Sequence, residues 1–600
     1  MKQPERPPVV AGRRSPTESR WRRLLESRLG QRLAFFVLAA LIGALVGLST
    51  LVLIKLVLLF QWIGYGAASE IRYAQIIAAR PAWQVVLVPA AGGLVLGILM
   101  QFLPGRRYHG IADVMEACAL NSARMPVRSG VGAGLAAAIS LGLGAPLGRE
   151  GPAVHIGASI SAWLAERLGL PHKQSLALLG CGAAAAVAVS FNTPIAAVIF
   201  ALEVIVGYFT LRVFAPIVIA TMLAMLVREY FLGQQALFPV LPNAIASNWE
   251  LILFASLGIL GAWVAKAMLA LTGGFEQAWK RSGLPRWCQP ALAGAMIGIV
   301  ALPLPHILGI GFEGTLLALR GDLDNGLVAW LLLAKFVVVC LALSSGFAGG
   351  IFGPAIFMGS MLGGVFWALA SLSGLPLSDQ GVYATIGMAA MGSALLGAPI
   401  STVLIVFELT HDYGITLGVM TAAAVASTVM QSGEHGSFFR WQLARRNVSL
   451  ASGRDISLLM THRVEKLIRT GYLQVHTDIT TGELESRMGQ ERQRIAIFVD
   501  EDGVFRGSVN LSLLISHAID NGMDSPAIDG ALDSAYAITS LTNIVTAVQS
   551  MAEHKQEYLP VVNRAKPKKP ELLGVVTKSD LLAEHYDVIK RAREEEFGIT

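Results

Sequence analysis

The chain has 600 residues, of which 54% are hydrophobic and only 15% are charged, and its formal net charge is +6. Soluble domains are about a quarter charged, so this composition excludes an ordinary soluble enzyme, and we expect no enzymatic activity. The basic excess does not indicate nucleic-acid binding, which requires a clustered basic face on a folded domain.

The charge is distributed in three regions. Residues 1–32 form a basic tail with 9 basic and 3 acidic residues, whereas residues 33–450 contain 37 charged residues, or 9%. Residues 451–600 are 26% charged, as in a soluble domain. We therefore predict a tail, a membrane domain over 33–447 and a soluble domain. Because basic segments stay on the cytoplasmic side, we expect a multi-pass protein of the inner or plasma membrane with both termini cytoplasmic.

The first apolar run, Leu33–Phe60, is long enough to cross a bilayer. Several of the later apolar runs are shorter than about 20 residues and are broken by Gly or Pro. Short, broken segments indicate helices that stop partway across a membrane and line a transport path. These later runs lie near 83–103, 131–147, 175–206, 213–232, 249–272, 290–311, 327–343, 351–371, 384–409 and 415–430.

Two motifs occur twice, in the same order. The segment GREGPAVHIG at 148–157 matches GIFGPAIFMG at 350–359 with an offset of 202, and PIAAVIFALE at 194–203 matches PISTVLIVFE at 399–408 with an offset of 205. This order and spacing predict a duplicated unit, with halves at about 33–232 and 249–446.

The first repeated motif suggests an anion site. A Gly-containing loop precedes Pro152 and Pro354, and proline favours the first position of a helix. Helices starting at these prolines would direct unpaired N–H groups and the positive end of the helix dipole towards an anion. The alternative is that these Gly and Pro residues serve only helix packing and kinking.

Glu150 lies inside this motif. A carboxylate in an apolar, anion-attracting site is costly, but a helix N-terminus stabilises its ionised form. An ionised Glu150 would occupy the anion position and a protonated one would leave it, which makes this residue a candidate gate. A capping carboxylate without a moving role is the alternative.

These motifs resemble the CLC family of chloride channels and proton-coupled chloride transporters, and the resemblance covers about residues 33–446. It implies a homodimer with one anion path per subunit, inverted repeats with broken helices, and Glu150 as the external gate. It also implies that backbone amides bind chloride or another small anion. The segments that carry the resemblance are GREGP (148–152), GIFGP (350–354), FNTPIAAVIFALE (191–203) and FELTHDY (407–413), and the implied amides are those of Arg149, Glu150 and Gly151 at an outer site and of Ile351 and Phe352 at a central one.

The chain departs from the family at both side-chain ligands of the central anion. Tyr108 and His109 align with the start of the family's GSGIP segment, which places His109 at the position of the anion-binding serine. Phe439 replaces the family's tyrosine and has no hydroxyl. His109 either replaces one ligand, with a charge that titrates near neutral pH, or is bonded to a carbonyl without contacting the anion.

A third departure concerns protons. The resemblance places a proton-transferring glutamate directly after Glu203, where this chain has Val204, which cannot relay a proton. Passive conduction is therefore our first expectation, with proton-coupled exchange as the alternative. Glu203 and Glu408 occupy equivalent repeat positions, and we expect them to be structural. We expect Lys335 to pair between helices or to extend towards the membrane surface.

The soluble region contains two similar strand–turn–strand–helix patterns, which resemble a tandem pair of CBS modules at 452–521 and 525–592. In that family a Thr and an Asp hold an adenine nucleotide, and Thr577 and Asp580 match them. Nucleotide sensing and purely structural dimerisation both remain open, and no cofactor is required.

Two other classes of function fit the sequence less well. A CBS-regulated divalent-cation transporter would need carboxylates along its path, and a membrane-anchored nucleotide sensor would leave the two Gly/Pro motifs unexplained. The four cysteines are too widely spaced to indicate a metal site or a disulfide framework.

Overall fold

In a computed structural model the chain divides into two units, Met1–Ser449 and Leu450–Thr600, which are described separately. Most of the predicted basic tail lies outside the described residues, as do His411 and Asp412 of the FELTHDY motif. The structure describes residues 28–103, 107–119, 123–207, 209–233, 245–410, 413–433, 436–446, 448, 459, 462–501, 504–533, 537–553, 557–563 and 571–596.

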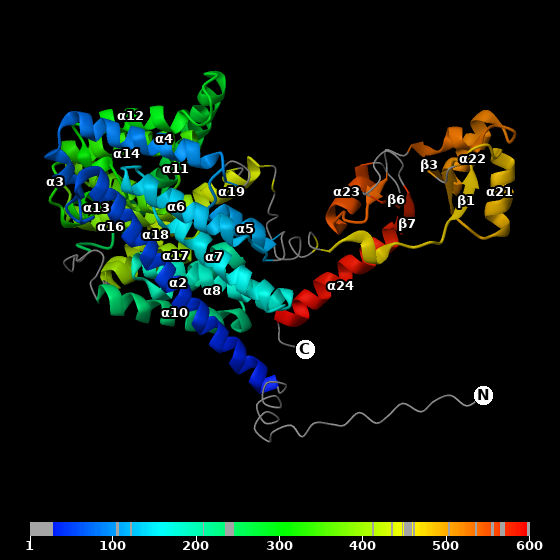
Figure 1. The fold of residues 1–600 in the computed structure, drawn as a ribbon, viewed down its shortest axis with the longest axis horizontal. Coiled ribbons are helices and arrows are strands. Elements are labelled where there is room, and N and C mark those ends of the chain that lie inside the picture. The colour runs from blue at the N-terminus through cyan, green and yellow to red at the C-terminus, as the bar shows by residue number, and fades with distance from the viewer. Residues whose placement is uncertain are drawn as a thin grey trace, which may run out of the picture. The chain divides into compact units, whose positions relative to one another are not determined.

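The described part of the first unit is helical (Figure 1). Its first half contains α2 (Arg28–Tyr65), α3 (Tyr73–Ala78), α4 (Ala82–Met100), α5 (Ile111–Ala119), α6 (Val127–Gly142), α7 (Glu150–Arg167), α8 (His172–Phe191), α9 (Pro194–Phe200), the π-helix η2 (Ala201–Val206) and α10 (Leu211–Leu232). Its second half contains α11 (Glu250–Arg281), α12 (Gln289–Ala301), the 3-10 helix η3 (Pro305–Ile307), α13 (Phe312–Arg320), α14 (Asn325–Ser345), α15 (Phe352–Ser371), α16 (Gln380–Leu396), α17 (Pro399–Thr410), α18 (Tyr413–Gln431) and α19 (Phe438–Ala444).

Eight of the described helices are long and apolar enough to cross a membrane. Two apolar runs that look continuous in the sequence each hold two helices. The run at 175–206 breaks at Asn192 (φ 61°) and the run at 384–409 breaks at Gly397 (φ 67°). Left-handed residues of this kind end helices, and a proline follows each one within two residues. The second helix of each run is therefore short, as predicted for broken segments.

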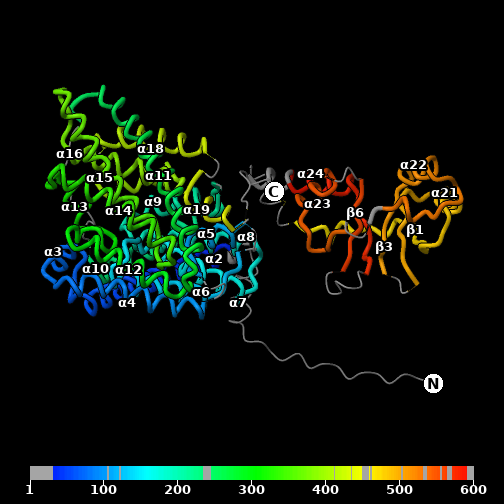
Figure 2. The backbone as a smooth tube through the Cα atoms, turned by 90° about the horizontal axis from the view of Figure 1, so that it is seen from above, coloured from blue at the N-terminus to red at the C-terminus, as the bar shows by residue number. Residues whose placement is uncertain are grey.

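The two halves repeat the same packing. Helices α7 and α8 pack together as α15 and α16 do, and α2 packs on α10 as α11 packs on α18. The equivalent short helices α9 and α17 also contact one another across the two halves. In Figures 1 and 2, α3 and α13 lie at one end of this unit and α5 and α19 at the other.

The second unit contains two small sheets. The first sheet has the order β1-β2-β3-β4, with β1 parallel to β2 and the other pairs antiparallel, and the second has the order β5-β6-β7. The elements around the first sheet are β1 (Leu473–His476), α21 (Thr481–Gln490), β2 (Ile495–Val499), β3 (Phe505–Asn510), α22 (Leu511–Asn521), η5 (Ala527–Gly530) and β4 (Leu532–Asp533). Around the second are η4 (Val464–Leu467), β5 (Ile538–Thr539), α23 (Ile544–Glu553), β6 (Tyr558–Val562), β7 (Leu572–Thr577) and α24 (Lys578–Glu596).

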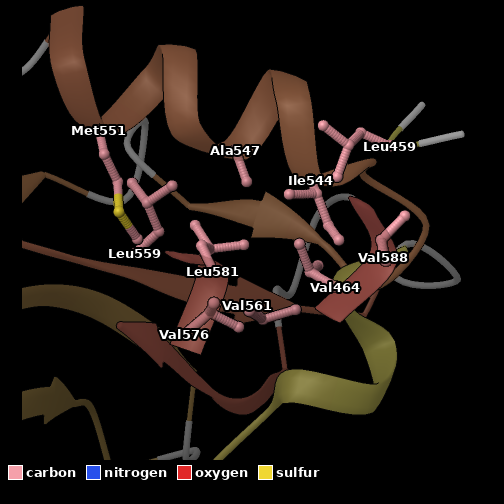
Figure 3. Packing of buried hydrophobic residues seen from close by; sticks show 10 residues of the cluster. All are labelled: Leu459, Val464, Ile544, Ala547, Met551, Leu559, Val561, Val576, Leu581 and Val588. Carbon is pink, nitrogen blue, oxygen red and sulfur yellow. The ribbon is translucent and has the colours of Figure 1, made fainter. Parts of the chain in front are cut away.

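The boundaries predicted for these two modules need correction. Leu459 and Val464, assigned above to the first module at 452–521, pack in the core of the second (Figure 3). Conversely, β4 at Leu532–Asp533 completes the first sheet although the second module was predicted to begin at 525. Each module thus takes a segment from beyond its predicted limit, because a sheet edge and a core accept side chains that are distant in sequence.

A shared core joins the two modules inside this unit. Ile497 and Phe505 of the first module pack with Tyr558 and Val575 of the second. The Tyr558 hydroxyl lies 3.2 Å from Ser508 Oγ, and burial raises the pKa of Tyr558 to about 12. The tyrosine is therefore neutral at physiological pH and keeps its O–H as a hydrogen-bond donor.

Candidate anion site

The two copies of the Gly/Pro motif meet inside the first unit. Gly148 and Gly350 form an antiparallel bridge in which each N–H donates to the other carbonyl, at 2.8 and 2.6 Å. Helices α7 and α15 begin two residues after these glycines, and their preceding residues have nearly identical backbones, with Arg149 at φ −88°, ψ −12° and Ile351 at φ −92°, ψ −13°. One site is therefore built from two equivalent helix N-termini.

Close approach of the two loops requires glycine. A Cβ at Gly148 would lie 2.9 Å from the Gly353 nitrogen, and one at Gly350 would lie 2.8 Å from the Gly151 nitrogen. Real Cβ atoms essentially never approach so closely, so any side chain here would push the loops apart. The repeated glycines predicted from the sequence thus have a specific steric role.

The predicted helix starts need correction. Pro152 and Pro354 occupy the third helical position, because the helices begin at Glu150 and Phe352. The first turn of a helix leaves its N–H groups unpaired, so proline costs no hydrogen bond at this position either. Its rigid backbone still favours the helix start.

Glu150 is the first residue of α7 and is only 1% exposed. Within the described residues, neither carboxylate oxygen has a hydrogen-bond partner of normal geometry, although the amides of Glu150 and Gly353 face the carboxylate. A buried carboxylate is costly, but the two facing amides and the two helix N-termini lower that cost. The side chain therefore lies buried between the starts of α7 and α15.

Arg149 directly precedes α7, and its guanidinium contacts Glu70 and Ser190. Its Nη1 lies 2.9 and 3.0 Å from the two carboxylate oxygens of Glu70, and its Nη2 donates to the Ser190 carbonyl at 3.2 Å. The guanidinium also lies 5.3 Å from the ring centroid of Phe312. Glu70 carries no sequence signal of this role, because no motif indicates a partner 79 residues away.

Ile351 and Phe352 lie at the equivalent start of α15, and both are buried. The Phe352 ring packs on Phe191 at 4.3 Å and on Phe200 at 6.3 Å between ring centroids. These side chains therefore fill apolar space, which leaves the backbone as the polar part of this half of the site.

His109 lies in a cluster of charged groups before α5. Its ring stacks on His155 of α7 with centroids 5.3 Å apart, and its Nδ1 lies 3.2 Å from Asp113 Oδ1. Asp113 also pairs with Arg107 at 2.6 Å and with Arg446 at 3.1 Å. Asp113 and His155 were not singled out from the sequence, although i, i+4 spacing from His109 to Asp113 could have indicated that pair.

Tyr108 and Phe439, the other two residues predicted to lie at a central anion, contact different groups. The Tyr108 hydroxyl donates to the Leu96 carbonyl of α4. Phe439 lies in α19, is 3% exposed and packs edge-on against Phe438 at 6.0 Å. Tyr108 therefore anchors its loop to α4, and Phe439 contributes an apolar ring.

The two repeated glutamates cap helices of the opposite half. Glu203 accepts hydrogen bonds from the N–H groups of Ile400 and Ser401, at 3.2 and 2.9 Å, at the start of α17. Glu408 accepts from Ile195 and Ala196, at 2.9 and 2.7 Å, at the start of α9. Each glutamate therefore accepts hydrogen bonds at the start of a helix in the other half. Val204, which directly follows Glu203, is buried in η2.

Lys335 is fully buried and does not extend to the membrane surface. Its ammonium donates to the carbonyls of Ile307 and Gly309, both at 2.8 Å, and lies 4.9 Å from the Phe357 ring centroid. The lysine therefore fixes the segment between α12 and α13, and the expectation of pairing within the protein is met by carbonyls instead of a carboxylate.

We expect Lys335→Met to lower the free energy of unfolding by about 2 kcal/mol, because two buried carbonyls lose a charged donor. Thermal unfolding in detergent measures this effect. Lys266→Met is the matched control, since the Lys266 ammonium lies over the Trp263 ring, 5.4 Å from its centroid. Equal melting temperatures for the two variants would contradict the anchoring role.

In the second unit, the structure brings Thr577 and Asp580 together at the start of α24. The Thr577 hydroxyl donates to Asp580 Oδ2 at 2.7 Å, and Arg469 Nη2 lies 2.5 Å from Asp580 Oδ1. At the equivalent position of the first module, Asn510 accepts from the Leu513 N–H and caps α22.

The sequence model of the family described as "Voltage gated chloride channel" matches residues 91–431, more than half of the chain. The chain belongs to this family. The CBS domain model matches residues 533–587, within the predicted second module.

Individual relatives agree with this CLC membership. The chain is similar to the chloride channel protein CLC-e of Arabidopsis thaliana, with 28% identity over 600 residues that cover 88% of this chain and 84% of the relative. Two solved CLC structures, a slow cyanobacterial Cl⁻/H⁺ antiporter and a fluoride/proton antiporter, align with TM-scores of 0.60 and 0.58, each at 22% identity. They cover 69% of this chain and 97% and 99% of their own chains, and they show that the fold is of CLC type.

Proposed function

We propose that this CLC protein carries chloride, or a chloride-like anion, across a membrane through the junction of α7 and α15, with Glu150 as the gate. The observation that carries this proposal is the buried Glu150 carboxylate, which lies between two helix N-termini and faces the amides of Glu150 and Gly353. A site with helix dipoles and amides, but without a full positive charge, holds an anion weakly enough to release it.

The gate works through the charge of Glu150. When the carboxylate is ionised it occupies the helix N-termini and excludes an anion. When it is protonated its attraction to the two dipoles falls, and a competing anion displaces it. The Glu70 ion pair holds Arg149 in place beside the gate, so that its backbone can stay fixed while the Glu150 side chain moves.

Passive conduction is the mode we propose first. Val204 carries no ionisable group, and Glu203 is bonded to the start of α17, so neither supplies a free proton relay. The alternative is proton-coupled exchange, since both solved neighbours are named as proton antiporters. A divalent-cation path is less well supported, because Glu203 and Glu408 already bind backbone amides.

We also propose a homodimer with a path in each subunit, in the inner or plasma membrane, with both termini cytoplasmic. The family membership supports the dimer. The nine basic residues before the first apolar run support the orientation.

Reconstituted liposomes test the proposal. We expect efflux of chloride, and of other small anions such as nitrate, fluoride or bicarbonate in an order to be measured, without uphill proton movement. Proton pumping driven by an anion gradient would overturn the passive mode and establish exchange. Protein-free liposomes are the control, and absence of flux with all four anions would contradict anion transport itself.

We propose an adenine nucleotide as an optional ligand of the second module, at Thr577 and Asp580. Any such ligand must displace the Arg469 ion pair on Asp580. We expect ATP or AMP to raise the melting temperature of the full chain, and Asp580→Ala to abolish that shift. Asp529→Ala is the control, because Asp529 lies in η5 and outside both strand-to-helix turns, and it should retain the shift. No shift in the wild-type protein would leave the module a structural role.

A further inference from the structure

A pocket lies beside the gate, at the C-terminal end of α2. It is small and partly open to solvent. The end of α2, the loop before α3, and the segment from η3 to the start of α13 supply its walls, and α3 and α13 lie together in Figures 1 and 2. Its polar and aromatic lining includes Gln61, Glu70, Tyr73, His306, Phe312 and Glu313.

Several buried polar atoms in this lining have no partner among the described residues. They are Gln61 Oε1, the Tyr73 hydroxyl and Glu313 Oε1, on side chains that are 2%, 5% and 6% exposed. Native proteins rarely leave buried polar atoms unpaired, except where water or a ligand satisfies them. The pocket is therefore built to hold water or a polar ligand next to the gate.

The charges at the pocket oppose an anion. Glu70 forms two hydrogen bonds with the Arg149 guanidinium, and Arg149 directly precedes the gate residue. The second carboxylate, Glu313, accepts from the Ala74 N–H with one oxygen and leaves the other unpaired. The positive charge nearest to the gate is thus cancelled by Glu70, and an approaching anion meets one uncompensated carboxylate.

We propose that Glu70 controls access of anions to the gate from this face by neutralising Arg149. The proposal rests on the proposed anion transport and adds a residue outside the repeated motifs. An anion at the pocket competes with Glu70 for the Arg149 guanidinium, so the ionised glutamate raises the anion concentration needed to load the path. Glu70 acts through Arg149 and is a positioning and access residue.

The test is anion uptake into liposomes containing the full chain, measured over a range of external chloride concentrations. We expect Glu70→Gln to lower the half-saturating concentration by about 3- to 10-fold, since it frees a charge at short range in a partly buried site. Glu70→Asp keeps the charge and should stay near the wild-type value. Glu166→Gln is the matched control, because Glu166 is exposed at the opposite end of α7.

A second measurement separates charge from a structural effect. Added impermeant gluconate screens exposed charges, so the difference between the wild-type protein and Glu70→Gln should shrink as ionic strength rises. A merely loosened Arg149 would lower uptake at every ionic strength. If Glu70→Gln does not fold, Glu70→Ala and Glu70→Asp are compared by the same two measurements.

The outcomes separate the two proposals. Equal half-saturation in the wild-type protein and Glu70→Gln, with normal uptake in both, would overturn the role of Glu70 and leave anion transport intact. A higher half-saturating concentration in Glu70→Gln would also overturn it. No uptake by the folded wild-type protein would contradict anion transport itself.

Discussion

Replacing Glu150 with glutamine produces anion flux that no longer depends on pH. In the wild-type protein, the protonated fraction of a carboxyl group falls tenfold for each pH unit above its pKa, so we expect flux to fall by up to about tenfold per unit as the pH rises. The amide cannot ionise, and the variant should keep the flux that the wild-type protein shows at low pH. Liposome efflux at a series of pH values measures the difference.

Two further variants sharpen this test of the gate. Glu150→Ala removes the side chain altogether, and we expect pH-independent flux at least as high as that of Glu150→Gln. Glu166→Gln changes a carboxylate of the same helix that lies outside the site, and its pH profile should match the wild-type profile. A retained pH response in both Glu150 variants would place the gate elsewhere.

Replacing Glu203 or Glu408, each of which caps a helix of the other half, is expected to destabilise the membrane domain. Glu203→Ala leaves the amides of Ile400 and Ser401 without their acceptor, and Glu408→Ala does the same to Ile195 and Ala196. Hydrogen bonds to charged groups contribute roughly 1.5–3 kcal/mol each, so we expect each substitution to cost about 3 kcal/mol. Thermal unfolding in detergent reports the loss.

The conservative variants distinguish a cap from a proton relay. Glu203→Gln keeps one carbonyl oxygen as an acceptor, and we expect it to lose less stability than Glu203→Ala. Glu166→Ala, at an exposed position, should melt like the wild-type protein. If Glu203→Ala melts like this control, the capping role is wrong. If Glu203→Gln instead stops proton movement at unchanged stability, the residue is a relay.

The repeated motifs made the centre of the fold predictable. Sequence identities at the glycines of 148–157 and 350–359 indicated two equivalent loops, and these loops meet in the structure. Such a prediction works because tight backbone packing leaves few residue choices, so the two copies remain recognisably alike. The breaks at Asn192 and Gly397 also carry local signals, since asparagine and glycine tolerate the left-handed backbone that ends a helix and each precedes a proline by two residues.

Contacts set by distant segments were not predictable. Glu70 reaches Arg149 across 79 residues, and the two repeated glutamates reach amides about 200 residues away. One sequence shows which groups are charged but not which are neighbours. The predicted boundaries of the two soluble modules were wrong for the same reason. Nothing in the local sequence indicates that Val464 packs in the core around α23.

The exchanged caps also constrain how the chain is made. The amides at the start of α9 leave the ribosome more than 200 residues before Glu408, the carboxylate that satisfies them. Until Glu408 is synthesised, the amides at the start of α9 therefore lack their acceptor. In the same way, Glu203 lacks the amides of α17 until that helix is made. Neither half can reach its final state alone. A chain that stops before Glu408 would therefore leave the start of α9 without its acceptor.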